Sequence, residues 1–336
     1  MTTIKEVAER AGVSPATVSR VMANAASVRP AYRERVLQAV AELDYRPNRL
    51  ASNLRRQTTA MIAVVVSDIE NPHFTQMVRA VEDAAYDRGF RVLLCNTDET
   101  AEKQRAYLDV LAAERVQGII LVPANPAPDG IDRVLDLGIP VVAFDRLVDD
   151  QRADAVVIDN AEGGRRATTH LLEAGHRRIG FVGGAPEIQT ARERESGYDA
   201  AMAAAGAAPL VANGAFRLDV GRAATNDLLD RGDVTALVVA NNLMTVGALQ
   251  AIRARGLRVP DDIALVTIDD PFWAALTDPP LTALAQPVRR MADAAAKLLF
   301  ERIDGARDRA RCLVFDFDLR VRRSCGVYTG TGGPGE

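Results

Sequence analysis

The stretch Ser14–Val21, SPATVSRV, combines a sharply defined helix start with an exposed polar face. Ser14 is a good N-cap because its hydroxyl accepts an unpaired backbone N–H of the first turn, and Pro15 suits the first helical position. Val18 and Val21 share one face that can be buried, so Arg20 faces outward. Such a helix suits a DNA groove, where Arg20 would donate two hydrogen bonds to a guanine edge.

The surrounding residues predict a helix-turn-helix. Thr3 and Glu6 form a capping box that opens a first helix, and Gly12 ends this helix in the left-handed conformation. A third helix begins near Pro30 and stops before Tyr45. In this arrangement the second helix enters the major groove. Short polar side chains around it would contact phosphates, which fixes the register without reading sequence; these are Thr17, Ser19, Asn24 and Tyr45.

A short basic segment, Arg49–Arg56, follows without a partner helix nearby in the sequence. A helix this short is marginal in water, so we expect DNA binding to order it, with Arg49, Arg55 and Arg56 on phosphates. Leu54 would wedge between base pairs in the minor groove and kink the duplex.

Positive charge is concentrated in this first part of the chain. Residues 1–60 carry ten basic and five acidic side chains, although the whole chain has a net charge of −4. A basic head on an acidic body is typical of a small nucleic-acid-binding module attached to another domain.

Length and cysteine usage restrict the class of protein. The chain has 336 residues, too many for one compact core, and no apolar run approaches the length of a membrane span. Charged residues interrupt any signal-peptide pattern at the N-terminus. Cys95, Cys312 and Cys325 have neither metal spacing nor a disulfide framework, which fits a reducing compartment. We therefore expect a cytoplasmic, nucleoid-associated protein with no membrane partner.

From residue 60 onward, apolar strands alternate with amphipathic helices, which predicts two parallel sheets covered by helices. The predicted strands are Met61–Val66, Arg91–Leu94, Gly118–Val122, Pro140–Phe144, Arg178–Val182, Ala236–Ala240 and Ile263–Thr267. The residues from Gly330 onward are predicted to be a disordered tail.

Polar side chains follow these strands, and parallel sheets bind ligands at the carboxyl ends of their strands. Carboxylates and amides accept adjacent hydroxyls, arginines donate to ring and hydroxyl oxygens, and aromatic faces cover the apolar side of a sugar. The candidate effector-binding residues are Asn71, His73, Phe74, Asp145, Arg146, Arg192, Arg194, Phe216, Asn242, Asp269 and Gln286.

The motif TIKEVAERAGVSPATVSRVMAN, the segment YRPNRLASNLRR and the strand after it resemble the LacI-type (lac/galactose repressor) family of bacterial transcription regulators. The resemblance continues through most of the chain. It implies a small all-α helix-turn-helix head plus an α/β periplasmic-binding-protein-like body of two parallel-sheet lobes. It also implies three crossovers between the lobes, a cleft between them, and a return of Val288–Ile303 to the first lobe.

The resemblance assigns DNA contacts by position. Pro15, Ala16 and Arg20 take the base-reading positions, and Leu54 is the minor-groove lever. Pro15 and Ala16 are too small for bidentate base contacts, which leaves thymine-methyl or shape readout. The full set of expected DNA-binding residues is Thr3, Ser14, Pro15, Ala16, Thr17, Ser19, Arg20, Asn24, Tyr45, Asn48, Leu54 and Arg55.

The resemblance also divides the chain. It implies a helix-turn-helix domain at 1–46, a hinge helix and linker at 47–59, a body at 60–328 and a tail at 329–336. The first lobe takes about 60–158 and 286–312, and the second takes about 159–285 and 313–328.

The cleft motifs FDR, ARER, FxxxxxG, NN, IDD and AQP resemble the ribose-like sugar pattern of the family's binding-protein relatives. The purine-binding branch of the family resembles this chain less at FDR. His73 is a departure, because many relatives carry an aromatic residue there.

No enzyme signature is found in the sequence. The histidines His73, His170 and His176 form no ligand cluster, and the glycines of Gly180–Gly184 are wrongly spaced for a dinucleotide. We expect no catalytic activity, no metal and no other cofactor.

The sequence therefore predicts a repressor that binds a pseudo-palindromic double-stranded operator as a homodimer or a tetramer. A small molecule in the cleft, predicted to be a ribose-like sugar, would control its operator affinity. A corepressor-dependent regulator that responds to a purine or a phosphoprotein is the main alternative. A sugar-binding protein without a regulatory role and a sugar-modifying enzyme are more distant ones.

Overall fold

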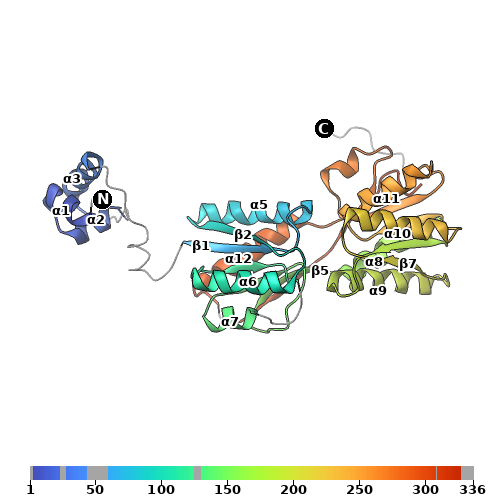
Figure 1. The fold of residues 1–336 in the computed structure, drawn as a ribbon, viewed down its shortest axis with the longest axis horizontal. Coiled ribbons are helices and arrows are strands. Elements are labelled where there is room, and N and C mark those ends of the chain that lie inside the picture. The colour runs from blue at the N-terminus through green and yellow to red at the C-terminus, as the bar shows by residue number, and fades with distance from the viewer. Residues whose placement is uncertain (1–2, 23–27, 44–59, 125–129, 308, 327–336) are drawn as a thin grey trace. The chain divides into compact units, whose positions relative to one another are not determined.

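The computed structural model describes residues 3–22, 28–43, 60–124, 130–307 and 309–326. The chain forms two compact units, Met1–Thr59 and Ala60–Glu336. Figure 1 shows the helical first unit and the two α/β lobes of the second.

Three helices form the described part of the first unit: α1 (Ile4–Ala11), α2 (Pro15–Met22) and α3 (Pro30–Glu42). The predicted capping box is confirmed, because Thr3 Oγ1 accepts the Glu6 N–H at 3.4 Å and Glu6 Oε2 accepts the Thr3 N–H at 2.7 Å. Gly12 follows α1 with a φ of 60°, the predicted left-handed conformation.

A small apolar core holds these helices together. Val7, Val18 and Val36 come from α1, α2 and α3 in turn, and all three are fully buried in one cluster. Val13 packs against the same cluster from the turn between α1 and α2. The apolar face of α2 is therefore fixed in the core, and the exposed residues of the helix, Pro15, Ala16 and Arg20, lie on its other side.

The first lobe of the second unit is a parallel six-stranded sheet in the order β11-β5-β4-β3-β1-β2. Its strands are β1 (Met61–Val66), β2 (Arg91–Asn96), β3 (Ile119–Leu121), β4 (Val141–Phe144), β5 (Asp154–Ile158) and β11 (Cys312–Phe315). The helices of this lobe are α5 (Pro72–Asp87), α6 (Ala101–Ala113), α7 (Ile131–Asp136) and α12 (Val288–Ile303) (Figure 1).

The second lobe has a six-stranded sheet in the order β12-β10-β9-β8-β6-β7. Its strands are β6 (Ile179–Gly183), β7 (Leu210–Asn213), β8 (Ala236–Val239), β9 (Ala264–Ile268), β10 (Thr282–Ala285) and β12 (Asp318–Arg320). The edge strand β12 is antiparallel to β10. The helices are α8 (Asn160–Glu173), α9 (Gln189–Ala204), α10 (Leu218–Asp230) and α11 (Asn242–Ala254), with a 3₁₀ turn at Phe272–Ala275.

The central strands are apolar because helices cover both of their faces. Residues 62–66 of β1 and all of β3, β4, β8 and β9 are buried. The predicted fold class, a helical head and a body of two largely parallel-sheet lobes, is confirmed.

The chain passes between the two lobes after β5, after β10 and after β11. The predicted end of the first lobe at residue 312 is wrong by three residues. Residues Cys312–Phe315 form β11 and pair with β5 of the first sheet, so the third crossover lies between Phe315 and Asp318. As predicted, Val288–Ile303 returns to the first lobe, where α12 packs beside α5.

Candidate functional site

Helix α2 starts in the way that its sequence predicts. Ser14 Oγ accepts the Thr17 N–H at 3.2 Å, and the two hydroxyls lie 2.9 Å apart. Pro15, Ala16 and Arg20 are exposed. The exposed side of α2 therefore carries small side chains in its first turn and one cation, Arg20, in its last turn.

The other expected DNA contacts divide into two groups. Thr17 and Ser19 are half-buried on α2, and Thr3 is exposed at the start of α1. The remaining predictions lie outside the described residues; they are Asn24, Tyr45, Asn48, Leu54 and Arg55.

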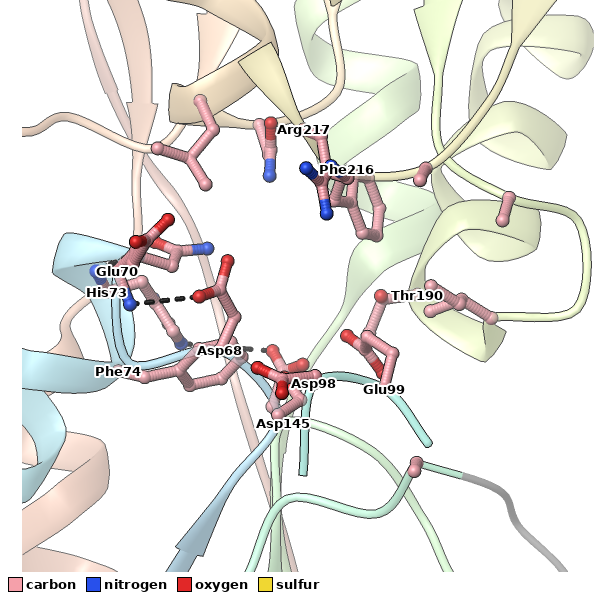
Figure 2. Close-up of a pocket in the computed structure, with 18 of the residues that line it drawn as sticks. Asp68, Glu70, His73, Phe74, Asp98, Glu99, Asp145, Thr190, Phe216 and Arg217 are labelled. Carbon is pink, nitrogen blue, oxygen red and sulfur yellow. Dashed lines mark hydrogen bonds and ion pairs between the residues drawn. The ribbon is translucent and has the colours of Figure 1, made fainter. Parts of the chain in front are cut away.

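A cleft of about 930 Å³ opens where loops that follow strands of both sheets meet. Figure 2 shows it with Phe216 and Arg217 across the open space from Asp98 and Asp145. Nine of the eleven predicted effector-binding residues line it: Asn71, His73, Phe74, Asp145, Arg146, Arg194, Phe216, Asp269 and Gln286.

Asp145 and Asp269 occupy equivalent places in the two lobes. Asp145 follows β4 and Asp269 follows β9, and their side chains are buried at 5% and 7% exposure. Both have left-handed backbones, with φ of 69° and 76°. Non-glycine residues are uncommon in that region, and they concentrate where a site over-determines the backbone. The two loops thus present one carboxylate from each lobe.

A chain of buried hydrogen bonds links the lobes at the base of the cleft. Asn242 Nδ2 donates to Asn71 Oδ1 and to Asp269 Oδ2, both at 2.9 Å. Gln286 Nε2 donates to the other oxygen of Asp269 at 2.7 Å. Asn71 Oδ1 also accepts the His73 N–H at 3.0 Å, which caps α5. The helix start of the first lobe and the strand end of the second therefore share one network.

Arg194 projects from α9 and is held in place by its own lobe. Its Nε donates to Asn160 Oδ1 at 2.8 Å, and its Nη1 donates to the Ala240 carbonyl at 2.7 Å. The guanidinium lies 5.9 Å from the centre of the Phe216 ring. The side chain is almost fully buried, so it is pre-positioned at the cleft wall.

Arg146 lines the cleft, but most of its donors are engaged within the first lobe. Its two terminal nitrogens donate to the carboxylate of Glu99 at 2.5 and 2.6 Å, and Nη1 also donates to the Pro123 carbonyl. Burial opposes the charged form of Arg146, but the hydrogen bonds and charge of Glu99 outweigh it and raise its pKa. A bidentate ion pair of this kind fixes the loop after β4. The remaining nitrogen, Nε, is buried 3.5 Å from Asp145 Oδ2 and has no hydrogen-bond partner among the described residues.

The predictions for Arg192 and Asn242 as cleft-lining residues are wrong. Arg192 is exposed, and its Nη1 donates to the carbonyls of Pro186 and Glu187. Residues two apart on a helix point to opposite sides, so Arg192 and Arg194 cannot share the cleft. Asn242 lies beneath the cleft in the network above, whereas its neighbour Asn241, the N-cap of α11, lines the wall.

Comparison with known proteins decides which family this arrangement belongs to. The model of bacterial regulatory proteins of the lacI family matches residues 3–48, and that of a periplasmic binding protein-like domain matches residues 168–325. The HTH-type transcriptional repressor PurR of Pasteurella multocida is 35% identical over 329 residues, which cover 96% of this chain and 98% of PurR.

The chain belongs to the LacI family of bacterial regulatory proteins. The prediction of a DNA-binding transcriptional repressor with an effector cleft is confirmed.

Other LacI-family proteins carry different ligands in their names. The ribose operon repressor of Halalkalibacterium halodurans is 35% identical over 305 residues, which cover 90% of this chain and 91% of that protein. A transcriptional regulator CelR–cellobiose complex superposes with a TM-score of 0.73 and 37% identity, over 96% of this chain and 100% of CelR. The lac repressor dimer bound to operator and the anti-inducer ONPF has a TM-score of 0.85 and 29% identity, over 96% and 99% of the two chains.

The cleft of this LacI-family chain also includes residues that the sequence did not identify. Asp68 and Glu70 follow β1, Asp98 and Glu99 follow β2, and Arg217 precedes α10. The β2 group was missed because the predicted strand ended at Leu94, two residues before the observed end. Both pairs of carboxylates could have been predicted as cleft residues from their positions just after the ends of parallel strands.

His73 is the least satisfied polar side chain at this site. It is 6% exposed, and neither ring nitrogen has a hydrogen-bond partner among the described residues. Nε2 lies 3.9 Å from Asp145 Oδ1, and the ring packs edge-on against Phe74 with centres 5.0 Å apart. Buried donors and acceptors normally have partners, so this imidazole is prepared for a ligand or a water molecule.

The described residues include no group of three or more His, Cys, Asp and Glu side chains arranged to hold a metal ion. None of the helices in the described part of the chain has the length and apolar character needed to cross a membrane.

Proposed function

We propose that this LacI-family repressor binds its operator through the exposed face of α2 and that a sugar in the interlobe cleft changes its operator affinity. Arg20 reads a guanine edge, and Leu54 acts as the minor-groove lever. Two protomers pair through their bodies, so that two heads meet a pseudo-palindromic operator.

One observation carries the regulatory part of the proposal: a single cleft is lined by polar side chains from both lobes. Asp145 and His73 come from the first lobe, and Arg194 and Asp269 come from the second. A ligand that contacts both sides binds one arrangement of the lobes better than another, and this difference in affinity is the driving force of the switch.

The connection to DNA runs through the first lobe. Its strand β1 begins at Met61, directly after the segment 47–59 for which we propose the hinge role. A change in the angle between the lobes alters the separation of the two hinges in a dimer. The paired Leu54 side chains can then no longer order together on the duplex.

A sugar fits the cleft because carboxylates, amides and arginines from several loops converge beside two aromatic rings. The alternative is a corepressor-dependent regulator that responds to a purine or a phosphoprotein. The proposal assigns no catalytic activity to the chain and places it in the cytoplasm with DNA.

The DNA-binding part is tested with a duplex selected from random sequence by the full chain, using fluorescence anisotropy. We expect Arg20→Ala to weaken binding by about 1–3 kcal/mol and to relax the base preference at one position. Arg222→Ala, an exposed arginine of α10 in the second unit, is the control. Equal affinity and equal base preference for Arg20→Ala and the wild type would contradict the assignment.

A further inference from the structure

We propose that the effector is an uncharged saccharide of at least two rings, and that a single pentose, a phosphorylated sugar and a purine are all poorer ligands. This inference rests on the proposed function, because it names the ligand class of the same cleft. It departs from the ribose-like ligand that the sequence motifs suggest.

The charge of the cleft argues against a phosphorylated ligand. Among the described residues, eight carboxylate side chains and three arginines line it. The negative charges crowd one another. Burial raises the pKa of Asp68 above its ordinary value, and the charges of Glu70, Glu99 and Asp98 raise it further, against the opposing hydrogen bond from the Glu70 backbone. A phosphate dianion brought into this field meets repulsion rather than attraction.

The three arginines do not reverse this effect, because each already has acceptors. Arg146 is bound to Glu99 through both terminal nitrogens. Arg194 donates through Nε and Nη1 to its own lobe. Arg217 contacts Asp219 through Nε at 3.4 Å, so its terminal nitrogens at the exposed rim remain as donors from a single side chain. A phosphate site needs several free donors that converge, and the described part of the cleft offers no such set.

The unpartnered buried atoms at the cleft floor match hydroxyl groups. Gln286 Oε1 is an acceptor, and Ser67 Oγ and the His73 ring can donate or accept, yet none has a hydrogen-bond partner among the described residues. Arg146 Nε, a donor, also lacks a hydrogen bond, although it lies 3.5 Å from Asp145 Oδ2. Each residue lines the cleft. A hydroxyl donates and accepts at the same time, so a polyhydroxylated ring can satisfy adjacent groups of mixed character.

The size of the cleft argues for more than one ring. Its volume of about 930 Å³ is near the upper end of the range for small-molecule sites, which is about 300–1,000 Å³. Polar groups continue from the buried floor at His73 to exposed residues at the rim, Asp98 and Arg217. Figure 2 shows Arg217 on the opposite side of the opening from Asp98. One ring satisfies the floor, and a second ring is needed to reach the rim.

Isothermal titration calorimetry of the full chain with cellobiose, maltose, D-ribose, D-ribose 5-phosphate and hypoxanthine tests the proposal. We expect at least one disaccharide to bind tenfold or more tightly than ribose, and ribose 5-phosphate to bind more weakly than ribose. The proposal is overturned if ribose equals both disaccharides, if ribose 5-phosphate or hypoxanthine binds more tightly than they do, or if neither disaccharide binds.

Two variants test the position of the second ring. Arg217→Ala is expected to weaken disaccharide binding about tenfold and to leave D-glucose binding unchanged. Arg222→Ala, on helix α10 that follows Arg217, is expected to change neither affinity. His73→Ala is expected to lower the affinity for both the disaccharide and D-glucose, because His73 lies at the floor of the cleft. A disaccharide affinity that Arg217→Ala leaves unaltered contradicts the extended binding mode.

The same samples separate this inference from the proposed function. If a disaccharide binds but the operator affinity stays constant, the regulatory proposal fails and the ligand class stands. If ribose binds best and changes the operator affinity, the ligand class fails and the regulatory proposal stands.

Discussion

The side-chain amide of Asn242 donates to Asn71 Oδ1 across 2.9 Å, which joins residues from different lobes at the base of the cleft. Both side chains are buried, and both lie at helix starts, Asn71 before α5 and Asn242 in the first turn of α11. A rotation of one lobe against the other must stretch this contact. The pair therefore reports the relative position of the lobes.

Removing this contact is expected to weaken the coupling between the lobes. Asn242→Ala removes the side-chain donor to Asn71 Oδ1 and to Asp269 Oδ2, which leaves each with one fewer buried hydrogen bond. This loss costs about 1–3 kcal/mol and lowers the melting temperature of the second unit. Asn71→Ala and Asn242→Ala combined should cost less than the sum of the single variants, because they break the same bond. Scanning calorimetry measures this.

Asn213→Ala is the control for the Asn242 prediction, since its amide donates to Glu195 on an exposed surface. Its melting temperature should stay close to that of the wild type. Strictly additive effects of Asn71→Ala and Asn242→Ala would show that the hydrogen bond does not couple the lobes.

The helical head should melt independently of the body. Val18 is fully buried between α1 and α3, so Val18→Ala removes two buried carbon atoms and destabilises the first unit by about 1–3 kcal/mol. Because the chain divides into two units between residues 59 and 60, the melting temperature of the second unit should stay unchanged. Leu37→Ala removes three carbons from an exposed position of α3 and is the control. A parallel shift of both transitions would contradict independent folding.

Asp270 should make the second unit sensitive to acid. Its buried carboxylate accepts from both terminal nitrogens of Arg322, at 2.7 and 2.8 Å, and from Arg320 at 2.7 Å. Burial opposes ionisation, but these hydrogen bonds outweigh it, so the pKa of Asp270 lies below its ordinary value. A lowered pKa contributes stability that is complete above the unfolded value of about 4 and is lost as the pH falls through the folded value.

The measurement is the melting temperature of the second unit between pH 7 and pH 3. Asp270→Asn should melt at a lower temperature than the wild type at pH 7, and the difference should narrow at the acid end. A constant difference over the whole range would assign the effect to packing instead of charge.

The contribution of Asp68 to the stability of the fold should depend on pH in the opposite direction to that of Asp270. Its raised pKa means that the folded state disfavours the ionised carboxylate, so its contribution to stability falls as the pH rises through the ordinary value and then the folded value. Asp68→Asn keeps an acceptor for the Glu70 N–H, which now lies 2.9 Å from Asp68 Oδ1. The variant should melt higher than the wild type at pH 7 and equally at pH 3. As a control, Asp261→Asn at an exposed position should not raise the melting temperature. A melting temperature of Asp68→Asn below that of the wild type at pH 7 would refute the argument that the cleft carboxylates repel one another.

Local rules were enough to predict the head. The capping box, the left-handed Gly12 and the buried Val18 depend on residues a few positions apart. The body strands before Asp145 and Asp269 were also predicted, because continuous apolar runs bounded by polar residues identify buried parallel strands.

Contacts between distant residues could not be read from the sequence. Arg146 was predicted to donate to a ligand, but Glu99, 47 positions away, accepts both of its terminal nitrogens. Residues 313–315 were assigned to the second lobe, but they belong to β11 and pair with β5 of the first lobe, whose residues lie 157 positions earlier. Asp98 and Glu99 were missed because the predicted strand ended at Leu94, two residues before the observed end of β2.

The central claim is that a ligand in the cleft controls operator binding. The most direct test is the anisotropy of a labelled, selected operator titrated with the full chain, with and without a ligand that calorimetry has shown to bind. For the wild type we predict that the bound ligand changes the operator affinity by about 5- to 150-fold, the usual range of such coupling. For Arg194→Ala, which lacks the arginine of the cleft wall, we predict that adding the ligand leaves the operator affinity unchanged. Equal operator affinity with and without a bound ligand in the wild type would contradict the account.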